Sequence, residues 1–248
     1  MLPITLNGSP AVGLRVHAPA RGVWFADVDL DLAAIAAPVP SGRVVLTVGA
    51  TVLSGTVDAE ASGRFGTKAR VRVVGGGNGW QKLVPAQHFH NDFGVLSTSV
   101  LQATGALVGE QVVDVTPSRL GADYVRTAGP AARVLADAEW YVDPTGITIV
   151  GPRPPVPLSP GADILTWDAT ARKAEIASDE IILPGTILVD VRFGTATVQD
   201  VEQTFGADGA RAVVWCKPTD APAKLPPGTR LARALAALAK ESSGVAYL

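Results

Sequence analysis

Short runs of β-branched residues recur along most of the chain, each bounded by glycine, proline or serine. Such runs predict short strands joined by tight turns rather than long helices. The 26 glycines and 19 prolines among 248 residues support this, because both residues favour turns. Gly49 and Ala50 predict a hairpin between two of the runs. Five runs suggest a small barrel or sandwich at the start of the chain: residues 13–17, 23–30, 43–48, 51–57 and 69–74.

The pattern changes near residue 80. Apolar residues then recur at spacings of four, three and four, which predicts a helix that Asn91 or Asp92 caps and Gly109 ends. The apolar stripe consists of Leu96, Val100, Ala103 and Leu107. Strands are predicted for residues 111–115, 139–143 and 147–150, and a second helix for about residues 121–138, in which Pro130 either breaks the pattern or starts a new helix at its first turn.

Residues 152–160 form a proline-dense linker, which is the clearest boundary in the sequence. Strand signals return beyond it, in residues 164–167, 173–176, 186–193, 194–198 and 212–215. A proline-containing loop over residues 217–230 precedes a short predicted helix. The apolar side of that helix consists of Leu231, Ala234, Leu235 and Leu238.

These patterns predict a mainly β fold with an α+β component, in which two small β-barrel-like modules flank an α/β module with two helices. The predicted boundaries are residues 1–80 for the N-terminal β-barrel-like module, 81–153 for the α/β module, 154–218 for the second β-barrel-like module, and 219–248 for a C-terminal linker and short helix.

Charged residues make up 18% of the chain, which is below the usual fraction of about 25%. So little charge favours an apolar surface that a partner covers, and a compact monomer with a large core is the alternative. The net charge is −2, and Lys and Arg do not cluster in any window. This composition argues against specific binding of nucleic acid or of an anionic membrane.

The single cysteine, Cys216, excludes a disulfide within the chain, and its strand-like surroundings predict a buried structural thiol. The first residues lack the basic and long apolar regions of a signal peptide. No stretch approaches the roughly 18 apolar residues of a membrane-spanning helix. We therefore expect synthesis and folding in the cytoplasm.

The densest group of potential metal ligands is His88, His90 and Asp92. Two histidines two residues apart on a strand face the same side, as metal ligands can, and Asp92 would have to complete the site. Histidines that pack and hydrogen-bond at the end of a strand explain the same pattern. We expect the latter, and hence no metal site and no cofactor.

Catalytic motifs are absent from the sequence. The glycine run 75–79 lacks the spacing of a phosphate-binding loop, and there is no nucleophile elbow. The carboxylate pairs Asp27/Asp29 and Asp179/Glu180 occupy ordinary strand or turn positions. Five tryptophans are spread over all modules, which favours core packing or subunit contact over a binding platform. We predict a protein that is not an enzyme.

Scattered positions between residues 70 and 153 resemble the baseplate hub proteins of bacteriophage tails, of the late control protein D type, and the hubs of related contractile injection systems. The resemblance rests on residues 73–80, 90–95, 109–110, 124–131, 140–143, Gly146 and 150–153. It implies two β-barrel-like modules with an α/β module between them. It also implies a ring of copies, which we expect to be a trimer, around the channel of a contractile tail.

The resemblance further implies a structural virion protein that joins the tail tube to the central spike and contacts other baseplate proteins. Many hubs are longer, and this chain ends at Leu248, so a lysozyme-like domain is expected on a separate protein. Two alternatives remain open from the sequence. One is a cell-wall hydrolase with carboxylates or a site near His88 and His90, and the other is a receptor- or carbohydrate-binding tail-tip module.

Overall fold

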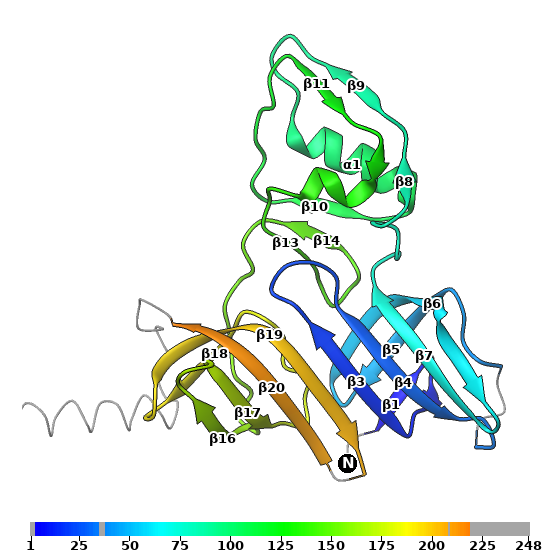
Figure 1. The fold of residues 1–248 in the computed structure, drawn as a ribbon, viewed down its shortest axis with the longest axis vertical. Helices are drawn as coiled ribbons and strands as arrows, with labels where there is room; N and C mark the ends of the chain where they lie inside the picture. Colours follow the sequence, from blue (N-terminus) through cyan, green and yellow to red (C-terminus); the bar gives the residue numbers. More distant parts are fainter. Residues whose placement is uncertain (1–2, 35–37, 208, 219–248) are drawn as a thin grey trace, which may run out of the picture.

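The computed structural model describes residues 3–34, 38–207 and 209–218 (Figure 1). Strands dominate these residues, and they contain one α-helix. The predicted mainly β class with an α+β component is confirmed. The predicted C-terminal helix falls within residues 219–248, which lie outside the described residues.

The N-terminal strands alternate between buried and accessible side chains, as an amphipathic β-sheet requires. In one of them Ala26, Val28 and Leu30 are buried, whereas Asp27 and Asp29 point outward. The predicted two-residue hairpin at 49–50 is confirmed by the pairing on either side of it. The strands are β1 (Ile4–Leu6), β2 (Ser9–Pro10), β3 (Gly13–Ala18), β4 (Phe25–Asp31), β5 (Arg43–Val48), β6 (Thr51–Phe65) and β7 (Lys68–Gly75).

The C-terminal strands join these in one 13-stranded sheet, because β19 pairs antiparallel with β3. The sheet runs in the order β16-β17-β20-β19-β3-β4-β7-β6-β5-β1-β2, and β15 and β18 pair off this path. The C-terminal strands are β15 (Val156–Pro157), β16 (Asp163–Asp168), β17 (Lys173–Ala177), β18 (Thr186–Asp190), β19 (Gly194–Gly206) and β20 (Gly209–Pro218).

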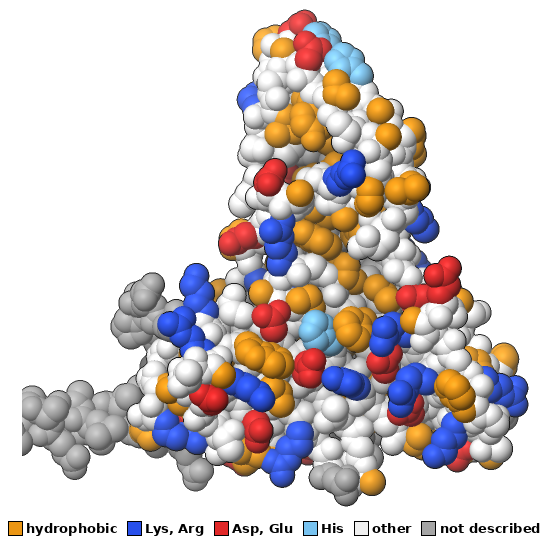
Figure 2. Space-filling model, in the orientation of Figure 1, with side chains coloured by type: hydrophobic (Ala, Val, Ile, Leu, Met, Phe, Trp, Pro, Cys, Tyr) orange, Lys and Arg blue, Asp and Glu red, His pale blue; other side chains and the backbone are white. Residues whose placement is uncertain are grey.

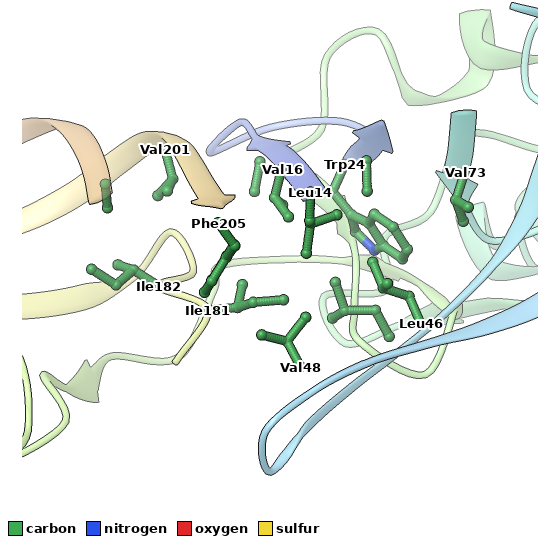
Figure 3. Close-up of a cluster of buried hydrophobic side chains, with 14 of the residues drawn as sticks. Leu14, Val16, Trp24, Leu46, Val48, Val73, Ile181, Ile182, Val201 and Phe205 are labelled. Atoms are coloured by element: carbon green, nitrogen blue, oxygen red, sulfur yellow. The ribbon is translucent and has the colours of Figure 1, made fainter. Parts of the chain in front are cut away.

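A shared hydrophobic core underlies this junction. Figure 3 shows Phe205 and Ile181 from the C-terminal part beside Leu14 and Val48 from the N-terminal part, and all four belong to one buried cluster. Gln203 is a fully buried polar residue in β19. Its amide accepts a hydrogen bond from the Ile182 N–H at 2.9 Å and donates to two backbone carbonyls, so its burial leaves no polar atom unpaired.

The C-terminal strands curl, and side chains bridge the seam between β16 and the β18–β19 turn. The Arg192 guanidinium donates to the carbonyl oxygens of Ile164 at 2.7 Å and Leu165 at 3.1 Å. Trp167 and Phe193 stack across the same seam with ring centroids 4.2 Å apart. Side-chain contacts thus replace strand pairing at this position.

The middle part of the chain stands above the large sheet in Figure 1 and has its own core around Trp80, Leu101 and Leu135. A three-stranded sheet, two short antiparallel ribbons and the helix α1 surround this core. The elements are β8 (Leu83–Val84), β9 (Gln87–His90), α1 (Ser97–Val108), β10 (Val112–Asp114), β11 (Asp123–Arg126), β12 (Gly129–Pro130), the 3-10 helix η1 (Ala131–Leu135), β13 (Trp140–Val142) and β14 (Thr148–Val150).

Backbone hydrogen bonds attach this middle part to the loop between β3 and β4. The Gly22 N–H donates to the Trp140 carbonyl at 2.9 Å, and the Val142 N–H donates to the Gly22 carbonyl at 3.1 Å. Arg21 caps the end of η1 by donating to the carbonyls of Leu135 and Ala136. Direct backbone pairing thus holds the two parts together in addition to the chain connection.

The predicted second helix at 121–138 is wrong. Residues 123–126 and 129–130 form β11 and β12, which pair with β9 and β8, and helical geometry is limited to the five residues of η1. Gly121 and Gly129 have φ of 99° and 144°, which a right-handed helix does not contain. The expected effect of Pro130 is confirmed, because the proline interrupts the predicted helix and directly precedes η1.

The first predicted helix is present but begins later than expected. Asn91 does not cap it; its side chain instead accepts a hydrogen bond from the Phe93 N–H at 2.9 Å and forms a turn. The helix starts at Ser97 after Leu96, which makes no side-chain cap. Its predicted end is confirmed, because Gly109 adopts a left-handed conformation with φ of 82°.

Candidate functional site

The candidate ligands His88 and His90 lie on β9, in a two-stranded ribbon with β11 at the tip of the middle part. His90 is directly opposite Asp123, and His88 is opposite Val125. Alternation along the strands therefore places both imidazoles and the Asp123 carboxylate on one face. Figure 2 shows histidine and acidic side chains together at this tip.

A single carboxylate oxygen connects the two histidines. Asp123 Oδ1 lies 3.0 Å from His88 Nε2 and 2.8 Å from His90 Nδ1, and Asp92 Oδ1 lies 3.2 Å from His90 Nε2. The hydrogen bond between His90 and Asp123 raises the pKa of His90 and lowers the pKa of Asp123. All four side chains are more than half exposed.

This cluster contains the three residues that the sequence singles out, and it adds Asp123. No sequence pattern indicated Asp123, because it lies 31 positions beyond Asp92 in a segment predicted to be helical. Within the described ranges, no group of three or more His, Cys, Asp or Glu side chains is arranged to hold a metal ion. The arrangement can bind and release protons at an exposed ribbon.

Two of the three carboxylates of β4, those of Asp27 and Asp29, form ion pairs with arginines. Asp27 accepts two hydrogen bonds of 2.8 Å from Arg72, and Asp29 accepts bonds of 2.8 and 3.1 Å from Arg70. Arg15 and Glu202 form a further pair across β3 and β19 at 3.3 Å. Figure 2 shows basic and acidic side chains alternating over these strands. Such paired groups form a solvated surface rather than a general acid and base in a cleft.

The glycine run after β7 packs against the end of α1. The Glu110 carboxylate accepts hydrogen bonds from the backbone N–H groups of Gly77 at 2.9 Å and Gly79 at 2.6 Å. A Cβ on Gly79 would lie 2.2 Å from the Val108 carbonyl oxygen, so only glycine fits there. These N–H groups bind the chain's own carboxylate in the position where a phosphate loop would bind its ligand.

Other candidate features are structural. Cys216 is buried, and burial raises the pKa of its thiol to about 12, which suppresses the reactive thiolate. Trp24 and Trp80 are buried in the two cores. The described surface has shallow pockets, such as one of about 350 Å³ that Val12, Phe65 and Arg70 help to line. Within the described residues, no helical segment is long and apolar enough to span a membrane.

Solved structures resemble this arrangement over most of its length. The 43 kDa tail protein of prophage MuSo2 from Shewanella oneidensis superposes with a TM-score of 0.60 at 10% identity, over 88% of this chain and 97% of that chain. A tail protein from Neisseria meningitidis gives a TM-score of 0.59 at 12% identity, over 87% and 96% of the two chains. The chain has the fold of phage tail proteins.

The same tail-protein fold extends to a secretion apparatus. The c3393 protein of E. coli is described as a component of the type VI secretion system that resembles the T4 tail proteins gp27 and gp5. It superposes with a TM-score of 0.60 at 11% identity, over 91% of this chain and 79% of that chain. No family model and no curated protein matches the sequence. The resemblance that the sequence shows to tail proteins is thus confirmed as one of fold.

Proposed function

We propose that this chain is a structural, non-enzymatic component of a phage tail or of a related injection apparatus. The observation that carries the proposal is the likeness of 87% to 91% of this chain to tail and secretion-system proteins of the same fold. A fold comparison that covered one barrel alone would give no such support. We place the protein in the assembled virion tail after synthesis in the host cytoplasm.

We further propose the role of a baseplate hub. In this role, copies of the chain form a ring, a trimer, around the channel of a contractile tail, and the ring joins the tail tube to the central spike. Two features support self-association: the low charged fraction of 18%, and exposed apolar side chains such as Val45, Val52 and Val191.

Mass measurement of the purified chain at several concentrations tests the proposal. The expected result is a species of three times the 25.5 kDa chain mass, in equilibrium with the single chain on dilution. A chain that remains single at the highest concentration, and that binds no tail protein of its own phage, would refute the hub.

The hydrolase alternative has a separate test. The carboxylates of the Asp27/Asp29 pair are each bound to an arginine, and the His88–Asp123–His90 cluster is exposed on a ribbon rather than set in a cleft. The proposed structural role predicts that purified protein does not lower the turbidity of a cell-wall suspension. Clearing that is lost in a His90→Ala variant would favour the enzyme instead.

A further inference from the structure

The large sheet offers little free strand edge for pairing with another molecule. At one end, β2 is a two-residue strand that ends in Pro10. At the other end, β16 has a bulge at Leu165, and Arg192 occupies two of its carbonyl oxygens. Proline, bulges and covered edges are how natural sheets prevent edge pairing. Copies of this chain are therefore expected to meet through side-chain faces.

One outer face of the N-terminal strands is almost uncharged. We call it the β5 face, and it contrasts with the ion-paired face of β3, β4 and β7. Val45 and Val52 on it are 43% and 49% exposed, and Arg43 is its charged residue. A shallow pocket of about 230 Å³ lies on this side, partly lined by Arg43, Val45 and Ser54. The β5 face consists of Thr5, Arg43, Val45, Thr47, Val52 and Ser54.

A second apolar feature lies at the opposite end of the strand order. Val191, in the β18–β19 turn, is 83% exposed. The Arg192 contact with the Leu165 carbonyl places this turn against β16, where Asp163 and Asp168 are also exposed. We call Asp163, Leu165, Asp168 and Val191 the β16 end.

The N- and C-terminal parts of the chain differ in charge in a way that favours contact between them. Residues 1–80 contain seven Lys and Arg against five Asp and Glu, whereas residues 154–218 contain five against nine. The β5 face carries Arg43, whereas the β16 end carries Asp163 and Asp168, and the adjacent Arg192 is paired with Asp190. Opposite charges around small apolar centres are the usual composition of a specific interface.

We propose that the β5 face of one copy binds the β16 end of the next copy, head to tail. The proposal rests on the proposed ring and identifies the surfaces that form it. Because the two patches differ, the contact is heterologous, and a heterologous contact that closes on itself generates a ring. Val191 and Leu165 cover Val45 and Val52, and Arg43 lies against Asp163.

Single aspartate substitutions test the two surfaces separately. Val45→Asp and Val191→Asp each place a charge at the apolar centre, and each is expected to raise the concentration for half-assembly by about tenfold or more. Val125→Asp is the matched control, since Val125 is 58% exposed on β11, away from both patches. It is expected to assemble as the unmodified chain does, and circular dichroism checks that all three variants fold.

A charge exchange provides an independent readout. Arg43→Glu and Asp163→Lys are each expected to weaken assembly, and the double variant is expected to recover most of it. Recovery shows that the two residues face each other between copies. If each substitution only damaged its own surface, the two effects on assembly would add in the double variant.

The outcomes separate this inference from the hub proposal. An unmodified chain that never assembles refutes the ring itself. Normal assembly of both Val45→Asp and Val191→Asp leaves the ring standing but overturns these surfaces. Loss of assembly in Val125→Asp alone also overturns them and points to the middle part of the chain as the contact.

Discussion

The Glu110 carboxylate holds the backbone N–H of Gly79 at 2.6 Å, and its second oxygen holds that of Gly77 at 2.9 Å. Glu110 follows directly on the Gly109 cap of α1, so these bonds fix the end of the helix to the chain that leaves β7. Trp80, which follows Gly79 in the chain, is buried in the core of the middle part. The glycine run is therefore a close-packed connection rather than a flexible linker.

Replacing Glu110 by Ala is expected to lower the free energy of unfolding by about 2–4 kcal/mol. The reason is that the buried N–H of Gly79 and the half-buried N–H of Gly77 lose their acceptor. An unsatisfied buried group costs about 1–3 kcal/mol, and a half-buried group costs less because water can reach it. Urea denaturation followed by tryptophan fluorescence measures the change. Glu110→Gln keeps one acceptor oxygen and should lose less, so equal losses in the two variants would contradict this account.

Gly79→Ala is expected to destabilise the protein by about 1–3 kcal/mol, because the added Cβ would meet a backbone carbonyl that cannot move aside. Gly161→Ala is the control, since its Cβ would meet nothing within 4 Å. That change should stay within about 0.5 kcal/mol of the original stability. A thermal melt of both variants decides the point, and matching melting temperatures would argue against the close contact.

The strands of the large sheet could be predicted because each shows a local signal. Alternating residues such as those of β4 are buried on one side only, and a short glycine-containing turn marks a hairpin such as Gly49-Ala50. The pairing of β19 with β3 could not be predicted, because it joins residues about 190 positions apart and neither strand signals its neighbour. The prediction of a second helix was wrong for a related reason, because the pairing of β11 with β9 overrode the helical pattern of residues 121–138.

In the candidate site, too, local patterns could be predicted but contacts between distant residues could not. The common face of His88 and His90 follows from strand alternation and could be predicted. Asp123 could not, because its approach depends on the register between β9 and β11. The acceptor role of Glu110 and the bridging role of Arg192 are also products of tertiary packing.

The His–Asp cluster predicts a specific titration. NMR of the imidazole resonances should give a His90 pKa above its ordinary value of about 6.5, and Asp123→Asn should lower it. Asp92→Asn should lower it less, because the Asp92 hydrogen bond is a weaker cause of the shift. An unchanged His90 pKa in Asp123→Asn would show that the contact does not form in solution.

The same shifts fix the pH range of the contact. Because the His90 pKa is raised in the folded protein, the stability that His90 contributes is fully present below about pH 6.5. It is lost as the pH rises through the folded-state pKa of His90. Because the Asp123 pKa is lowered in the folded protein, the stability that its carboxylate contributes is present above about pH 3.9. It is lost as the pH falls through the folded-state pKa of Asp123. Amide exchange in β9 and β11 should therefore be slowest between about pH 4 and 6.5, after correction for intrinsic rates.

Cys216 should react slowly with a thiol reagent in the folded protein. With a pKa of about 12, roughly one thiol in ten thousand is ionised at pH 8, and burial also blocks access. Reaction should become fast in urea, where the thiol has an ordinary pKa. Rapid labelling of folded protein, with no change on adding urea, would place this thiol at the surface.

Arg192→Ala tests whether one side chain protects the sheet edge. Loss of the guanidinium frees the carbonyls of Ile164 and Leu165, so the seam between β16 and the β18–β19 turn depends on the Trp167–Phe193 stack alone. Amide exchange in β16 should become faster, and the protein should aggregate more readily because an uncovered edge can pair with another chain. Arg15→Ala, which removes an exposed ion pair on the face of the sheet, is the control and should leave both unchanged. If the two variants behave alike, Arg192 is an ordinary surface residue and the stacked rings alone hold the seam.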